Sequence, residues 1–188
     1  MIDNTREIYI SVDIEASGPI PGEYSMLSLG ACVVDDMGKS FYVELKPICH
    51  NCIPEALAVS NLDLKQLQKT GDDPAHAMNN FATWIAEVTE DGSPIFVGFN
   101  ASFDWAFVNW YFYKFLNRNP FGIGGIDIKA FFMGLYGTTW NLTCSSLLPA
   151  EFQANSKHTH NALDDAQSQA QIFQKIHAAS MRRAERYP

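Results

Sequence analysis

The first quarter of the chain carries the alternation of apolar and polar residues that is typical of β-strands. Such runs extend over Glu7–Ile14, Met26–Val34 and Ser40–Leu45. Side chains of a strand point alternately to its two faces, so the three runs predict three strands. Residues 16–24 contain two glycines and two prolines, which exclude a helix there. A short turn over Asp35–Lys39 would join the last two strands, which predicts an antiparallel meander.

The rest of the chain alternates between helical and strand patterns. Pro54–Lys69 is helical but interrupted in its middle, and apolar residues recur at helical spacing over Asp73–Val88. Ser93–Phe99 is apolar enough to form a buried fourth strand. The remaining predicted elements are a helix from a Ser102 cap to about Leu116, a short strand Gly124–Ile128, a helix Lys129–Tyr136, a polar loop Glu151–Thr159 and a last helix Ala162–Arg182. The order β-β-β-α-β-α-β-α predicts an α/β fold with helices packed on a mixed sheet.

Acidic residues follow two of the predicted strands. Asp13 and Glu15 share one face at the end of the first strand, whereas Ile14 points to the core. Asp104 lies in the first turn of the helix after the fourth strand, which we expect to lie beside the first strand. Each feature alone has a simpler interpretation, because an acidic pair can lead into a polar loop and the helix dipole favours an aspartate.

The start of the last helix adds a histidine and a fourth acid. His160 lies in the preceding loop and Asp165 in the first turns of the helix, with His158 and Asp164 as alternatives for the same positions. A histidine titrates near neutrality, so it can accept a proton from an attacking water. Four converging carboxylates would repel one another unless divalent cations lay between them. Two such cations can activate water and stabilise the leaving oxygen of a phosphodiester, so the pattern predicts a metal-dependent nuclease.

The overall charge narrows the class of substrate. The 188 residues include 13 lysines and arginines against 21 acids, a net charge of −8. This excess argues against nonspecific clamping of long duplex DNA, which requires a basic face. A small or single-stranded substrate that is held locally remains compatible with it. The hydrophobic fraction of 47% indicates a folded globular protein.

Cysteine usage and targeting signals suggest an intracellular, cytoplasmic protein. No segment approaches the length of a membrane span, and no signal-peptide pattern opens the chain. Cys49 and Cys52 form an isolated C-x-x-C without the second pair that completes a zinc site. A metal-binding scaffold built around these cysteines remains an alternative to the nuclease.

The acidic stretches resemble the three exonuclease motifs of the DEDDh 3′–5′ exonucleases, a family of the ribonuclease H-like superfamily. Its members include proofreading exonuclease subunits, ribonuclease T and oligoribonuclease. The resemblance extends from Ile8 to about Phe173. The matching residues are Asp13 and Glu15 in the first motif, Asn100, Phe103 and Asp104 in the N-x-x-F-D of the second, and His160 and Asp165 in the H-x-A-L-x-D-A of the third. The third match selects these two residues over His158 and Asp164.

The resemblance implies a fold, an activity and cofactors. The fold would be ribonuclease H-like, with a central mixed five-stranded sheet flanked by helices, in one exonuclease domain over residues 1–188 with its core at about 7–178. The activity would be hydrolysis of single-stranded nucleic acid or short oligonucleotides from the 3′ end to nucleoside 5′-monophosphates. Asp13 would bridge two Mg²⁺ or Mn²⁺ ions, Glu15 and Asp165 would complete one metal site, and Asp104 would serve the other through water. His160 would be the general base.

Substrate contacts follow less directly from the motifs. Ala16, Ser17 and Gly18 are small and would let a nucleotide approach the backbone, although the family usually has threonine in this stretch. Asn100 and Phe103 would contact the nucleotide from the second motif, in which Phe99 replaces the usual histidine. Met26 or Leu29 would wedge against the terminal base, unless both pack in the core. Asp127 would support the metal ligands or the fold.

Two questions stay open at this level. The same fold could serve as a nucleic-acid-binding or polymerase-associated module with little activity of its own. DNA and RNA 3′ ends are both compatible as partners, because their discrimination depends on contacts to a 2′-hydroxyl. Many stand-alone relatives form homodimers, so a homodimer is also compatible with the sequence.

Overall fold

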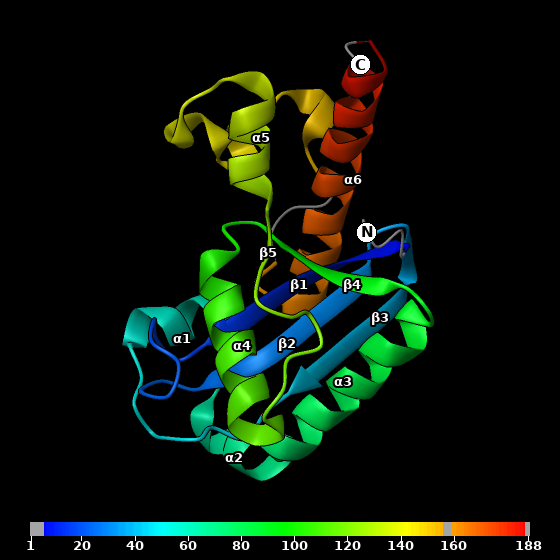
Figure 1. The fold of residues 1–188 in the computed structure, drawn as a ribbon. Helices are drawn as coiled ribbons and strands as arrows, with labels where there is room; N and C mark the ends of the chain where they lie inside the picture. Colours follow the sequence, from blue (N-terminus) through cyan, green and yellow to red (C-terminus); the bar gives the residue numbers. More distant parts are fainter. Residues whose placement is uncertain (1–5, 156–158, 187–188) are drawn as a thin grey trace.

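A computed structural model describes residues 6–155 and 159–186 and contains one five-stranded sheet (Figure 1). The strands are β1 (Glu7–Ala16), β2 (Met26–Val33), β3 (Asp36–Glu44), β4 (Ser93–Gly98) and β5 (Gly125–Asp127), and their order in the sheet is β3-β2-β1-β4-β5. The first three form an antiparallel meander, and β4 and β5 add in parallel on the other side of β1. The predicted mixed sheet, with the fourth strand beside the first, is confirmed.

Helices cover both faces of this sheet (Figure 1). The α-helices are α1 (Pro54–Ser60), α2 (Leu64–Thr70), α3 (Pro74–Thr89), α4 (Ser102–Leu116), α5 (Ile128–Tyr136) and α6 (Ala162–Arg186). The 3₁₀ helices η1 (Trp140–Thr143), η2 (Ser145–Leu147) and η3 (Ala150–Phe152) lie between α5 and α6. Helices α3 and α4 lie on one face, whereas α6 crosses the opposite face (Figure 1). No helix in the described ranges is long and apolar enough to span a membrane.

The alternation in β1 separates the hydrophobic core from the polar site. Ile10, Val12 and Ile14 belong to the core cluster that includes Phe107 and Tyr111 of α4. Residues of the opposite parity face α6, as the ring contact between Tyr9 and Phe173 demonstrates (centroids 5.2 Å apart). Asp13 and Glu15 have this second parity, so they point to the α6 side at the end of the strand.

Helix α6 begins in direct backbone contact with β2. A Cβ atom on Gly30 would lie 2.2 Å from the carbonyl carbon of Ala162, so only glycine permits this approach. Asp165 follows Ala162 by about one helical turn. The contact therefore fixes the position of the Asp165 carboxylate relative to β1.

Two sequence-based predictions of local structure were wrong, and one kind of element was missed. Strand β3 begins at Asp36 and not at Ser40, because a register shift at Cys32/Val33 shortens the turn. The sequence pattern missed these residues since β3 is an exposed edge strand, and its polar residues resemble those of a turn. Ser102 does not cap α4. The cap position is Ala101, whose amide donates to Asp127 (2.6 Å). The three 3₁₀ helices were not predicted, since segments of three or four residues carry little periodicity.

The Gly30 contact generates a stability prediction. Gly30→Ala should destabilise the fold by about 1–3 kcal/mol or more, because the new methyl group must displace the α6 backbone. Gly38→Ala is the matched control on the neighbouring strand, where the nearest atom to a new Cβ is a side-chain oxygen of Asp36 at 3.4 Å. Urea unfolding measures both variants. Equal midpoints for the two would contradict the role given to the contact.

Candidate active site

The first two acids lie at the carboxyl end of the central strand. Asp13 is 8% exposed and Glu15 is half-buried. The pairing of β1 with β2 shifts register between Glu15 and Ala16, directly after the acidic pair. Such a bulge bends the strand locally and changes the direction of the side chains around it. The acidic pair therefore lies where the regular sheet ends.

Asp104 comes to this point from the first turn of α4. Its side chain is 5% exposed, and its Oδ1 accepts a hydrogen bond from the Ile14 amide at 3.1 Å, between the two acids of β1. The turn before α4 passes through Asn100 at φ 65°, a left-handed conformation that asparagine tolerates better than most residues. Asp127 holds the turn through the Ala101 amide and also caps α5 through the Ala130 amide. Asp127 thus supports the site through the backbone.

Asp165 lies inside the loop that carries the histidine. The side chain is fully buried, and its two oxygens accept hydrogen bonds from the amides of Thr159 and His160, both at 3.0 Å. Asn161 caps α6 by accepting from the amides of Leu163 and Asp164. His160 itself is exposed and adopts φ 59°. The alternative base, His158, lies outside the described residues, and Asp164 is exposed.

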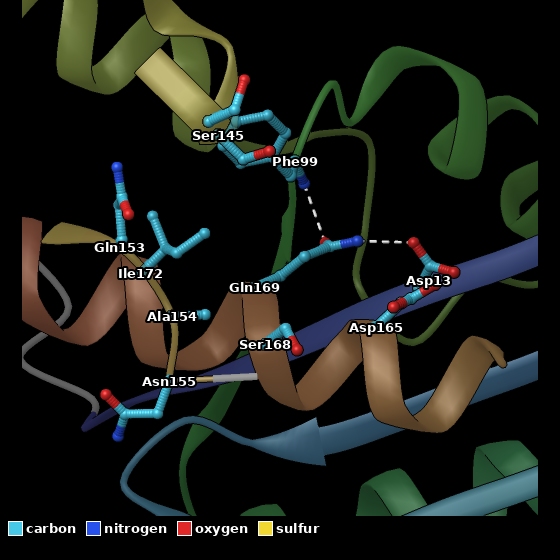
Figure 2. Close-up of a pocket in the computed structure, with 11 residues that line it drawn as sticks. Asp13, Phe99, Ser145, Gln153, Ala154, Asn155, Asp165, Ser168, Gln169 and Ile172 are labelled. Atoms are coloured by element: carbon cyan, nitrogen blue, oxygen red, sulfur yellow. Dashed lines mark hydrogen bonds between the residues drawn. The ribbon is translucent and has the colours of Figure 1, made fainter. Parts of the chain in front are cut away.

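Gln169 is a member of the site that the sequence did not predict. Its Nε2 donates to Asp13 Oδ1 at 2.5 Å, and its Oε1 accepts from the Phe99 amide at 2.8 Å (Figure 2). The second bond fixes the orientation of the carboxamide, so the NH₂ group must face Asp13. The only signal in the sequence is its position one helical turn after Asp165, on the same face of α6.

Burial and mutual repulsion favour the protonated form of two of these acids. Burial raises the pKa of Asp13 well above its usual range, the charges of Asp104, Asp165 and Glu15 raise it further, and the Gln169 bond opposes the shift. Burial likewise raises the pKa of Asp104 to about 7, against the opposing effect of the Ile14 amide. Cations between the carboxylates would reverse this preference.

The donor set fits hard divalent cations. Glu15, His160 and Asp165 each offer one ligand atom, and these atoms lie within 4.8 Å of one another. Among the residues that the structure describes, no other group of three histidine, cysteine or acidic side chains meets this condition. Cys49 instead donates its thiol to the Glu23 carbonyl at 3.1 Å. Carboxylate oxygens are the ligands that Mg²⁺ and Mn²⁺ prefer.

The predicted substrate-contact residues divide into exposed and buried ones. Asn100 and Phe103 are exposed at the start of α4, next to Asp104. The hydroxyl of Ser17 is fully buried, donates to the Asn51 carbonyl and accepts from the Ser25 amide. Ala16 is 6% exposed, so both side chains lie within the protein. The Ser17 backbone is also engaged, because its amide donates to the Ser25 carbonyl and its carbonyl accepts from the Ile53 amide, both at 2.8 Å.

Gly18 and Met26 serve the packing of the same loop. A Cβ on Gly18 would lie 2.2 Å from the ring of Tyr24, which explains the need for glycine. Met26 and Leu29 are both fully buried, and the Met26 amide donates to the Tyr111 hydroxyl. Of the two interpretations given to Met26 and Leu29, packing in the core therefore describes this structure.

Comparison with known proteins yields a family and a close relative. Residues 8–177 match the family model described as the 3′-5′ exoribonuclease Rv2179c-like domain. The chain is 48% identical over 172 residues to the 3′-5′ DNA exonuclease Cap18 of Escherichia coli, covering 91% of this chain and 92% of the relative.

Solved structures share the fold at low sequence identity. The nuclease domain of 3′hExo, a DEDDh family member bound to rAMP, is 12% identical with a TM-score of 0.71, over 95% of this chain and 94% of that one. E. coli Exonuclease I in complex with a dT13 oligonucleotide is 15% identical with a TM-score of 0.69. The present chain spans 43% of the length of Exonuclease I. The predicted resemblance to DEDDh exonucleases is confirmed.

The raised pKa of Asp104 generates a prediction for the metal-free protein. A folded-state pKa of about 7, against an ordinary 3.8, means that the carboxyl group contributes stability below about pH 4 that is lost as the pH rises through 7. In EDTA, Asp104→Asn should unfold at the same temperature as the native protein at pH 4. At pH 8 the variant should be more stable, by up to about 4 kcal/mol.

Calorimetric unfolding across this pH range measures the difference. Asp36→Asn, at an exposed site on β3, is the control and should show no such pH-dependent gain. A native protein whose stability stays level from pH 4 to 8 would contradict the assignment.

The Gln169 contacts generate a second prediction. Gln169→Leu should weaken Mn²⁺ binding by roughly 10–100-fold, because Asp13 loses the donor that orients it. The Phe99 amide would also lose its acceptor, at a cost of about 1–3 kcal/mol of stability. Gln167→Leu on the same helix is the control, since it removes only a 3.4 Å bond to the Met37 carbonyl. Isothermal titration with Mn²⁺ compares them, and equal affinities would exclude an orienting role for Gln169.

Proposed function

The chain belongs to the 3′-5′ exoribonuclease Rv2179c-like domain family, and from this premise we propose its substrate and its catalytic residues. It is a 3′–5′ exonuclease. The proposed reaction removes nucleoside 5′-monophosphates one at a time from the 3′ end of single-stranded DNA. It would use two divalent cations and His160 as the general base.

One observation carries this proposal, namely the convergence of the acids and His160. Asp13, Asp104 and Asp165 are buried and come from three different elements. They nevertheless lie close enough that the charges of Asp104 and Asp165 both raise the pKa of Asp13. A protein that only bound nucleic acid would gain nothing from this arrangement, because buried carboxylates destabilise the fold and repel phosphates. The arrangement therefore favours catalysis over the alternative of a binding module.

The metal ligands divide between two positions. Glu15 and Asp165 would hold one cation together with Asp13, and Asp13 would share the second with Asp104. When bound, the cations would lower the pKa of water and stabilise negative charge on the phosphate and on the leaving oxygen. Gln169 and the amides of the His160 loop keep the carboxylate oxygens in fixed positions.

His160 would move the proton. A ring nitrogen of His160 lies within 4.8 Å of ligand oxygens of Glu15 and Asp165, which is where the attacking water would be held. The exposed ring can pass the proton on to solvent. Loss of a 3′-oxygen from the scissile phosphate then leaves a nucleoside 5′-monophosphate and a shortened strand.

Exposed residues next to Asp104 would receive the terminal nucleoside. The Phe103 ring is 37% exposed and packs against Phe107 with centroids 5.3 Å apart, so one face is supported. Such a ring can stack on a base of any sequence. Asn100 is exposed in the turn directly before α4 and is the second residue proposed to contact this nucleoside.

DNA is the substrate that the closer comparison favours. The 48% identical relative is named a DNA exonuclease and matches nearly end to end. RNA is the second candidate, because the family model is described as an exoribonuclease domain. The two candidates predict opposite rate ratios on oligonucleotides of identical sequence.

A ladder experiment tests the proposal. The purified protein is incubated with 5′-labelled single-stranded DNA or RNA in Mg²⁺, Mn²⁺ or EDTA. We expect a ladder of products shortened from the 3′ end, formed faster from DNA than from RNA. The ladder should disappear in EDTA and with the Asp104→Asn variant. A faster RNA ladder would transfer the proposal to RNA, and the absence of cleavage of either would refute it.

His160→Ala should lower kcat by roughly 10²–10⁴-fold, because the variant loses the proposed proton acceptor. The fold should stay intact, since the residue is exposed and its backbone amide, which holds Asp165, is retained. The control is His76→Ala, another exposed histidine, which lies on α3. Single-turnover rates from pH 6 to 9 compare the variants. A His160→Ala enzyme with the native rate and pH profile would remove His160 from the mechanism.

A further inference from the structure

A pocket of about 530 Å³ opens next to the catalytic acids, with Asp13 and Asp165 at one end (Figure 2). It lies between α6, the turn after β4 and the η2–η3 segment. We propose that this pocket binds the nucleoside on the 5′ side of the scissile phosphate, with its base against the Phe99 ring. This inference rests on the proposed exonuclease function and adds a second nucleoside site to it.

The position of the pocket separates it from the proposed site of the terminal nucleoside. The two nucleosides joined by a phosphodiester lie on different sides of the phosphate. Phe103 and Asn100 belong to the α4 side of the acids and do not line the pocket. The pocket instead follows α6 through Ser168 and Ile172 (Figure 2). Helices α4 and α6 pack on opposite faces of the sheet, so the two sites flank the acids (Figure 1).

The lining matches a base and sugar better than a phosphate. The described lining residues include no lysine, arginine or histidine. Ser145 and Asn155 contribute uncharged polar groups, whereas Phe99 and Ile172 contribute apolar surface. A nucleoside has the same combination, with apolar ring faces and polar edges. The volume lies within the range of ordinary small-molecule sites.

The wall of the pocket is fastened to α6 before any ligand binds. Lys175 donates from Nζ to the Gln153 carbonyl at 2.6 Å, and the Asn155 amide donates to Oε1 of Gln171 at 3.0 Å. The Gln153 side chain in turn donates to the Leu148 carbonyl at 2.8 Å. A pocket with such fixed walls binds without a large ordering cost.

An abasic residue at one position of the substrate tests the proposal. Two 5′-fluorescein-labelled DNA oligonucleotides differ only in the second residue from the 3′ end, which is a normal nucleotide in one and a tetrahydrofuran abasic residue in the other. The native enzyme should release the first nucleotide from the abasic strand with a kcat/KM lower by about tenfold or more, as expected for the loss of a stacked base.

Two variants connect this difference to the pocket. Phe99→Leu removes the ring but keeps the amide that holds Gln169, and Ala154→Phe fills the pocket from its half-buried wall. Both should lower kcat/KM on the intact strand by about tenfold and bring the ratio between the two strands close to one. Inhibition by a nucleoside 5′-monophosphate should not change, because the product occupies the other site. Ala178→Phe, on the exposed side of α6, is the control and should keep the native ratio.

Equal rates of the native enzyme on the two strands would overturn the proposal, as would variants that slow both strands equally. Fluorescence anisotropy with the Asp104→Asn protein in Mg²⁺ measures binding of the same oligonucleotides without turnover. A tenfold weaker affinity for the abasic strand supports the pocket even if the native protein cleaves neither strand, and equal affinities refute it. Failure of the pocket and failure of the exonuclease proposal are therefore distinguishable.

Discussion

The burial of three carboxylates at one point is the constraint on which the structure depends. Asp13, Asp104 and Asp165 are at most 8% exposed, and each adds to a negative field that the others must tolerate. Unpaired buried charges cost several kcal/mol each, so the bare protein relieves the strain by favouring protonation of Asp13 and Asp104. Cations would relieve it in a different way, by pairing with the ionised oxygens. Protonation and cation binding would thus be alternative ways to reduce the repulsion, and only cation binding would suit catalysis.

Hydrogen-bond donors from separate parts of the chain keep the acids in place through this change. The amide of Ile14 holds Asp104, the amides of Thr159 and His160 hold Asp165, and Gln169 holds Asp13. For Asp13 and Asp104 the donor belongs to a distant segment of the chain. For Asp165 the donors belong to the loop directly before α6. Two further contacts position these segments relative to β1. The backbone of Gly30 contacts that of Ala162 at the start of α6, and Asp127 accepts from the amide of the turn before α4. The acids, which repel one another, thus lie where β1, α4 and α6 are fastened together.

The sequence predicted the features that depend on local pattern. Strand alternation placed Asp13 and Glu15 on one face, and the order of strands placed β4 beside β1. The sequence pattern did not identify Gln169, because its role depends on a contact with Phe99, 70 residues earlier. Such a contact leaves no periodic signal in the sequence. The same limit applies to Met26, whose burial is secured by a bond from its amide to the Tyr111 hydroxyl, 85 residues later in the chain. The 3₁₀ segments that wall the pocket are too short for any pattern and are held by single bonds such as that of Lys175.

The proposed nucleoside sites offer an explanation for how an acidic protein could hold a nucleic acid. With a net charge of −8, the protein gains little from neutralising phosphates along a strand. Stacking on Phe103 and Phe99 on the two sides of the acids would instead hold the two nucleosides that flank one phosphate, and cations would neutralise that phosphate alone. Stacking tolerates every base, because each has an apolar face. Such a grip needs unpaired bases that can separate from their neighbours, which a duplex does not provide, so the same arrangement would favour single-stranded ends.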